Sequence, residues 1–318
     1  MSTLYRTLTF SMGLLFIMWV HGFNACFLCH YANASSYPIS DNVLYNIPHS
    51  LCSTEEDVDT KFLPLVKVRS QNSSWLAISV YDDGYKAVEK TTLNDFEKNR
   101  LVMLFQKSDS NYCLKAVLDN PTGQRDDSFG YSIAISDSGA QLAIGSPRAT
   151  HIVKRHSRYK TKIDENDVAP GAVFVYELSD NKWWFQHQIK STHQGYLDYF
   201  GAAISFATDS TTLAIGAPWK AEVVHTMTED VVYPFVGELY IFQFNKERWI
   251  ETQTISPKET VSGTNFANRI RFDETNNLLF VSDSPNITTN HAIREHAFRY
   301  ESGRWKLIRV NEISRNRN

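Results

Sequence analysis

The sequence lacks the features that mark several large classes of protein. Its 318 residues carry a net charge of −3 and no long polar tract, so we expect a globular chain with no nucleic-acid partner. It has no His-Glu-x-x-His motif and no phosphate-binding glycine-rich loop, and no Ser/His/Asp set can be assembled from spacing. Beyond the N-terminus, no segment has helical periodicity over ten residues. We therefore expect an all-β protein that is not an enzyme and needs no cofactor.

The N-terminal segment has no acidic side chain before Asp41 and a single early cation, Arg6. Its apolar run, residues 9–20, is too short for a comfortable membrane span and is typical of a signal-peptide core. We predict that residues 1–25 are a signal peptide; an uncleaved anchor or an organellar presequence are less favoured. The protein is then secreted or lumenal, and meets a membrane only if the segment stays attached.

The chain has only four cysteines, Cys26, Cys29, Cys52 and Cys113. Beside a secretory signal, an even number favours two disulfides, for which three pairings are open. The stretch from Cys26 to His30 matches the Cys-x-x-Cys-His haem-attachment pattern, but no helices surround it, so a disulfide or a coincidence is the better interpretation; lipid attachment at Cys26 fits poorly. Three sequons permit N-glycosylation, at Asn33, Asn72 and Asn286.

A repeated phrase dominates the rest of the chain. Residues 129–135 read FGYSIAI and lead to LAIGSP, while residues 200–205 read FGAAIS and lead to LAIGAP. A strand-like segment beginning at a glycine then follows in each copy, and a tryptophan stands 12 residues after that glycine in both. Such a repeat at a fixed period predicts an array of similar structural units.

This spacing locates two degenerate copies. The phenylalanine slots fall at positions 63, 129, 200 and 266, which gives periods of 66, 71 and 66 residues. Leu63 then occupies the first slot, and Tyr112 and Trp305 stand where the clear copies have tryptophan. Four short strands in each unit predict a four-bladed β-propeller over residues 61–312, with an N-terminal extension (26–60) and a tail (313–318). The repeat residues are expected to pack the blades: Phe129, Gly130, Gly145, Pro147, Phe200, Gly201, Gly216, Pro218, Trp183 and Trp249.

These motifs resemble the FG-GAP repeat, which is found in the propellers of integrin α-subunits. Integrin-type repeats often carry a calcium loop before the second strand. The corresponding turns at 136–139 and 208–211 are too short and have one carboxylate each, and the turn at 273–277 has two carboxylates but lacks the glycine and the spacing, so we expect no metal. Four blades are fewer than the family usually has. We favour closure of the ring, helped by a strand at 42–47 added to the last blade; the alternative is an open array completed by a partner.

Partner binding is expected on one rim of the propeller. In an antiparallel meander, the connections after each second and fourth strand all leave from the same side, and the resemblance implies that ligands bind there. The longest of these loops, 148–170 and 219–236, are respectively basic and apolar. We therefore predict a binding or adhesion module for a protein or anionic partner; alternatives are a structural subunit of a larger complex and, less favoured, an enzyme. The predicted partner-binding residues are Lys154, Arg155, Arg158, Lys160, Trp219, Tyr233 and Phe235.

Overall fold

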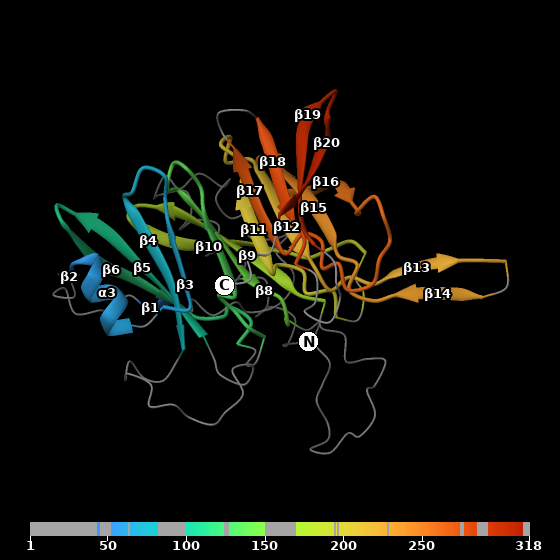
Figure 1. The fold of residues 1–318 in the computed structure, drawn as a ribbon. Coiled ribbons are helices and arrows are strands. Elements are labelled where there is room, and N and C mark those ends of the chain that lie inside the picture. The colour runs from blue at the N-terminus through green and yellow to red at the C-terminus, as the bar shows by residue number, and fades with distance from the viewer. Residues whose placement is uncertain are drawn as a thin grey trace, which may run out of the picture. The chain divides into compact units, whose positions relative to one another are not determined.

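The computed structural model describes residues 43–44, 52–62, 64–81, 100–123, 127–149, 170–193, 195, 197–227, 229–273, 277–284 and 292–313. The chain divides into two units, residues 1–40 and 41–318, and every described residue belongs to the second. Antiparallel strands make up most of these segments (Figure 1). None of the described helices is long and apolar enough to cross a membrane.

Each predicted repeat forms one antiparallel sheet whose four main strands are hydrogen-bonded in chain order. Sheet 1 contains β3 (Val66–Arg69), β4 (Trp75–Tyr81), β5 (Arg100–Ser108) and β6 (Asn111–Leu118). Sheet 2 contains β7 (Ser132–Ile135), β8 (Gln141–Ser146), β9 (Ala172–Ser179) and β10 (Lys182–Ile189). Sheet 3 contains β11 (Ala203–Phe206), β12 (Thr212–Ala217), β15 (Glu238–Phe244) and β16 (Trp249–Ile255). Sheet 4 contains β17 (Arg269–Asp273), β18 (Leu278–Ser282), β19 (Ile293–Glu301) and β20 (Arg304–Ile313).

The first strands of the four sheets share a common centre. β3 lies next to β7, β7 next to β11, and β11 next to β17. A cavity of about 220 Å³ is lined by residues of all four strands, among them Val68, Ile133, Ile204 and Phe272. The arrangement of the sheets is therefore propeller-like.

Apolar clusters join neighbouring sheets. One packs sheet 1 on sheet 2, a second packs sheet 2 on sheet 3, and a third packs sheet 3 on sheet 4. No cluster among the described residues joins sheet 4 to sheet 1. The free side of sheet 1 instead packs against α3 (Glu55–Phe62), through Val58 and Phe62. The closure that the sequence favoured is thus not made by the part of the chain that the structure describes.

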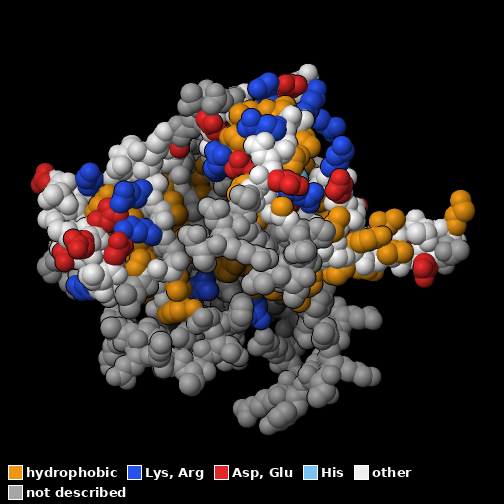
Figure 2. Space-filling model, in the orientation of Figure 1, with side chains coloured by type: hydrophobic (Ala, Val, Ile, Leu, Met, Phe, Trp, Pro, Cys, Tyr) orange, Lys and Arg blue, Asp and Glu red, His pale blue; other side chains and the backbone are white. Residues whose placement is uncertain are grey.

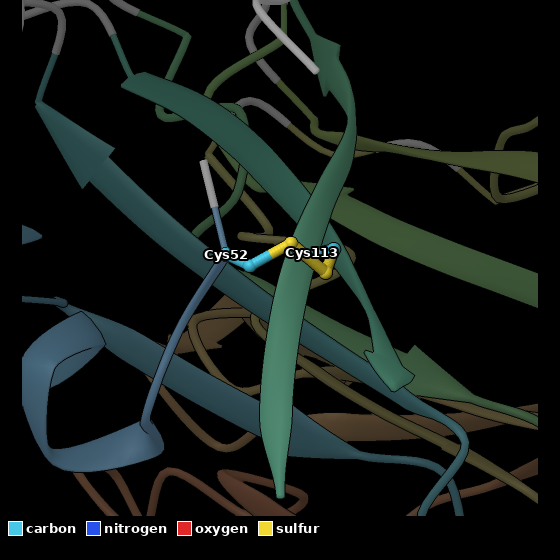
Figure 3. The surroundings of a disulfide bond; sticks show 2 residues. All are labelled: Cys52 and Cys113. Carbon is cyan, nitrogen blue, oxygen red and sulfur yellow. A yellow bond between two sulfur atoms is a disulfide. The ribbon is translucent and has the colours of Figure 1, made fainter. Parts of the chain in front are cut away.

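The segment before sheet 1 extends that sheet. β1 (Val43–Leu44) and β2 (Cys52–Ser53) both pair with β6, so the prediction that this stretch adds a strand to the last blade is wrong. A disulfide joins Cys52 to Cys113 and fixes β2 on β6 (Figure 3). The other two cysteines, the proposed signal peptide and the Cys26–His30 motif lie outside the described residues.

Helix α3 begins directly after β2 because Thr54 caps its N-terminus. The Thr54 hydroxyl accepts a hydrogen bond from the Asp57 N–H (3.2 Å), while the Asp57 carboxylate accepts from the Thr54 N–H and hydroxyl. This reciprocal arrangement is a capping box, and it starts a helix that is too short to show periodicity in the sequence. The sequence prediction accordingly contained no helix here.

The repeated glycines are explained by the contacts between sheets. A Cβ added to Gly145 would overlap the carbonyl oxygen of Gly201 in the next sheet, and one added to Gly216 would overlap that of Ala267. Gly171 lies equally close to Phe200, whose N–H donates to the Pro170 carbonyl (2.9 Å). The motif therefore brings its Phe-Gly corner against two glycines of the preceding sheet.

The other repeat residues also pack as expected. Phe129, Phe200, Pro147, Pro218 and Trp183 are buried, and Trp249 is half-buried at the start of β16. In the worn copies, Tyr112 and Trp305 are buried at the second position of β6 and β20, where Trp183 stands in β10. Leu63 lies outside the described residues, but β3 begins three positions after it, as β7 does after Phe129.

Candidate functional site

The connections that follow the second and fourth strands of each sheet all leave from one rim of the array. We call it the long-loop rim, and the candidate site lies there. In sheet 3 the connection after β12 is almost fully described and carries a two-stranded hairpin, β13 (Glu222–His225) and β14 (Asp230–Tyr233). Residues 150–169 of the basic loop that follows Pro147 lie outside the part of the chain that the structure describes. The predicted binding residues Lys154, Arg155, Arg158 and Lys160 therefore lie outside the described residues and remain a prediction.

The hairpin projects from sheet 3 and carries apolar side chains (Figures 1 and 2). Val223, Val232 and Met227 are exposed, the last of them completely. Tyr233 pairs with Glu222 at its base and is half-buried. Tyr233 therefore belongs to the hairpin, and among the described residues its ring makes no contact with the rings of Trp219 or Phe235.

Trp219 and Phe235 join two tyrosines in a continuous group of rings. The Trp219 ring stacks on Tyr199 with centroids 3.8 Å apart, and meets Phe235 edge-on at 5.7 Å. Tyr199 in turn meets Tyr131 edge-on at 6.0 Å. Tyr199 is buried, whereas Tyr131, Trp219 and Phe235 are 36%, 37% and 43% exposed. Three partly exposed rings thus adjoin the buried Tyr199: Tyr131 and Trp219 contact it directly, and Phe235 contacts Trp219.

Arginine extends this group onto sheet 1. The guanidinium carbon of Arg100 lies 5.6 Å from the ring centroids of both Tyr81 and Tyr131. We call these six residues the aromatic row: Tyr81, Arg100, Tyr131, Tyr199, Trp219 and Phe235. Burial raises the pKa of the Tyr199 hydroxyl, and the nearby cations Arg148 and Arg100 act in the opposite direction. The row thus has positive charge beside exposed rings.

A charged network holds the loop next to Trp219. The Lys220 ammonium donates to Asp198 Oδ2 (3.1 Å) and to the carbonyl of His193, and lies 4.0 Å from Glu238 Oε2. The Tyr240 hydroxyl donates to the same Glu238 oxygen (2.5 Å); burial, and then the Glu238 charge, raise its pKa. Because Asp198 and Glu238 are both largely buried, the network is expected to rigidify the base of the row.

The two clear repeats tie this rim together in the same way. The N–H of Trp219 donates to the Asp198 carbonyl (3.2 Å), and the N–H of Arg148 donates to the Asp127 carbonyl (3.1 Å). Each bond links the residue after the motif proline to the residue two positions before the motif phenylalanine. The backbone of the repeat therefore sets the position of Trp219 and Arg148.

Sequence reasoning found part of this site. It selected Trp219 and Phe235 from the apolar loop but did not select Tyr81, Arg100, Tyr131 or Tyr199. A signal for the last three was present, because Tyr131 follows a motif Phe-Gly pair, Tyr199 precedes a motif phenylalanine, and Arg100 stands in a glycine slot. These residues that the sequence prediction missed are thus direct neighbours of motif residues or occupy motif positions.

Of the predicted glycosylation sites, only Asn72 is described. Its Oδ1 accepts hydrogen bonds from the Ser74 N–H (3.0 Å) and the Ser70 hydroxyl (2.7 Å), and its Nδ2 donates to the Ser138 carbonyl of sheet 2 (3.2 Å). The atom that would carry a glycan is thus used in a contact between sheets. Asn33 and Asn286 lie outside the described residues.

The turn at 208–211, one of those compared with calcium loops, is held by its own side chains. The Asp209 carboxylate accepts hydrogen bonds from the Thr211 and Thr212 N–H groups (both 2.8 Å) and from the Thr212 hydroxyl (2.9 Å). The described residues contain no group of three or more His, Cys, Asp or Glu side chains placed to hold a metal ion.

No family model and no curated protein matches this chain. Among solved structures, the chain is similar to hydrazine synthase from Kuenenia stuttgartiensis (10% identity, 79% of this chain and 49% of that one, TM-score 0.41). It is also similar to a hypothetical selenium-binding protein from Sulfolobus tokodaii (8%, 77% and 53%, TM-score 0.45) and to a periplasmic gluconolactonase from Pseudomonas aeruginosa (9%, 77% and 71%, TM-score 0.37). The chain thus spans about half the length of the first two. At these values the likenesses carry no argument about function.

Proposed function

We propose that this chain is a β-propeller of four FG-GAP-like blades that serves as a secreted or lumenal, non-catalytic binding module. The observation that carries the proposal is the aromatic row, which spans sheets 1 to 3 on the long-loop rim. Exposed aromatic and arginine side chains are enriched where proteins bind one another. A partner surface that combines apolar side chains with carboxylates would complement it.

The Cys52–Cys113 disulfide supports the secretory part of the proposal. Disulfides persist in oxidising compartments and are rare in the cytosol, which agrees with the signal peptide predicted at residues 1–25. The basic residues at 154–160 would add positive charge to the same rim, because their loop leaves it directly after Arg148.

Cross-linking capture with matched variants tests the proposal. Wild-type protein would be cross-linked in the extracellular fluid of the source tissue or culture, and the captured proteins compared with those captured by Trp219→Ala and Arg100→Gln. Trp184→Ala is the control, because Trp184 is 39% exposed on β10, away from the row. We expect a partner that the control retains and both row variants lose. A partner set that is unaffected by both row variants would reject the proposal.

The basic loop needs its own variant. Replacing Lys154, Arg155 and Arg158 with glutamine should weaken binding of the captured partner without lowering the melting temperature. Unchanged binding would remove these residues from the site while leaving the aromatic row to be judged by Trp219→Ala.

A second candidate function is a permanent subunit of a larger complex. The exposed apolar residues of the β13–β14 hairpin favour it, because projecting apolar side chains are commonly buried in an assembly. Size-exclusion chromatography with light scattering separates the two: a stable, dispersed monomer argues against an obligate subunit, whereas aggregation that is relieved by Val223→Ser with Val232→Ser argues for it.

A further inference from the structure

Sheet 4 ends the series of sheets, and its two faces differ in chemistry. Leu279, Val281, Phe298 and Trp305 point toward sheet 3 and belong to the apolar cluster there. The strand register places different residues on the opposite face, because directly paired residues share a face and successive residues alternate. No sheet packs on that opposite face within the described residues.

The opposite face is rich in cations. Arg271, Phe280, Ala297 and Arg309 form one row across the four strands, and Arg299 pairs directly with Lys306 in another. Six exposed cations share this surface, here called the cationic face: Arg269, Arg271, Arg299, Arg304, Lys306 and Arg309. Figure 2 shows Lys and Arg side chains gathered over β19 and β20.

Three carboxylates share this face, Asp273, Glu295 and Glu301, and Glu301 pairs directly with Arg304 in the strand register, so the face carries six cations against three anions. Arg271 lies 3.2 Å from Glu295, and Arg299 lies 4.0 Å from Glu301. The other four cations, Arg269, Arg304, Lys306 and Arg309, make no ion pair with a described residue. Like charges on adjacent strands repel one another, so this face is costly unless an anion covers it or solvent screens it.

The spacing suits a polymer with regularly placed anionic groups. Residues two apart on a strand lie about 7 Å from one another, and neighbouring strands lie about 4.8 Å apart. Arg304 and Lys306 on β20 therefore form a short line of charge beside Arg299 on β19. Because these charges stand on paired strands, binding would not require a loop to become ordered.

The same face has, among its described residues, no exposed aromatic ring on which the bases of a single-stranded nucleic acid could stack. Phe280, its aromatic residue, is 7% exposed and lies 3.8 Å beneath the Arg271 guanidinium, so it offers no platform for stacking on bases. Arginine is also well suited to planar, bidentate recognition of oxyanions.

We propose that the cationic face binds a sulfated polysaccharide. The sulfate groups would lie against Arg304, Lys306 and Arg309 on the edge strand and against Arg299 beside them. This site is separate from the aromatic row, and its test does not depend on the partner proposed for that row.

The test measures binding of the full-length purified protein to a heparin-derived oligosaccharide by calorimetry or biolayer interferometry, over a range of salt concentrations. The variant is Arg304→Gln/Lys306→Gln/Arg309→Gln, and the matched control is Lys107→Gln/Lys115→Gln/Lys182→Gln, which removes three exposed cations from sheets 1 and 2. Both triple variants change the net charge equally. We expect the first to weaken binding by about tenfold or more at physiological salt, with a shallower salt dependence, and the control to bind nearly as wild type.

Three results would overturn the proposal. The first is unchanged affinity in the cationic-face variant. The charges would then be explained by protection of the edge strand β20 against pairing with strands of other molecules. The second is an equal loss of affinity in the control variant, which would show that binding depends on net charge and not on the cationic face. The third is equally tight binding of duplex DNA that depends on the same residues, because the face would then not select polysaccharide. If the triple variant does not fold, as judged by its thermal melt, Arg309→Gln alone is compared with Lys115→Gln by the same criteria.

Discussion

Replacing Gly145 with alanine tests whether the contact between sheets 2 and 3 depends on the absence of a side chain. The added Cβ would lie about 1 Å inside the closest approach that real Cβ atoms make, and the atom it meets is the backbone carbonyl oxygen of Gly201. It would also overlap the Ser132 hydroxyl, which donates to that same oxygen (2.7 Å). The Gly201 oxygen belongs to the backbone, so one sheet must move relative to the other even if the Ser132 side chain rotates away.

The size of the effect follows from these two contacts. Forcing extra volume into a packed interface costs about 2 kcal/mol, and loss of the Ser132 hydrogen bond adds about 1 kcal/mol. We therefore expect Gly145→Ala to lower the free energy of unfolding by about 3 kcal/mol, or the melting temperature by roughly 6–12 °C. Gly145 is not at positive φ, so backbone strain plays no part in this estimate.

The assay is thermal and urea unfolding followed by circular dichroism, with Gly303→Ala as the control. Gly303 has φ +80° and nothing within 4 Å of an added Cβ, so its substitution costs only the left-handed backbone conformation, about 1–2 kcal/mol. If Gly145→Ala is no more destabilising than Gly303→Ala, the close contact between sheets does not limit stability and our explanation of the motif glycines is wrong.

Three further results are expected. Cys52→Ser/Cys113→Ser should lower the free energy of unfolding by about 4 kcal/mol because the bond closes a loop of 61 residues; melts of wild type with and without reductant measure this, and coincident curves would contradict it. Burial raises the pKa of Asp127 from 3.8 to about 6, so the stability that this group contributes is greatest below about pH 4 and is lost as the pH rises to 6. Comparison of urea midpoints over this range should show that Asp127→Asn removes this component of the pH dependence, and identical pH dependence in the variant and the wild type would contradict the assignment. Melts with and without EDTA should coincide, and a large shift would show that a turn binds calcium.

The fold could be predicted from the sequence in those parts of the chain where the repeat could be recognised. The spacing between the clear copies placed Tyr112 and Trp305 correctly, because each sheet must repeat the same contacts with its neighbour. It gave no information on the segment before sheet 1. Two-residue strands such as Val43–Leu44 have no pattern from which register can be read, so their pairing with β6 rather than with the last sheet depended on the tertiary structure. The Cys52–Cys113 pairing was likewise one of three until the strands were in place.

The repeat determines where the aromatic row lies, although most of the row residues are not themselves part of the repeated motif. Phe200, Gly201 and Pro218 are committed to contacts within and between sheets, and a change at any of them would disturb the array. Their immediate neighbours lie on the same rim and do not fill the contacts between sheets, so Tyr199 and Trp219 can be large and stack on each other, although Tyr199 adopts a left-handed backbone conformation (φ 61°). Because every copy offers equivalent neighbours, residues far apart in sequence reach one surface: Tyr131 comes from the second copy and Tyr199 from the third. The repeat residues themselves are used for packing, but the repeat still determines which neighbouring positions reach the rim and can hold binding residues.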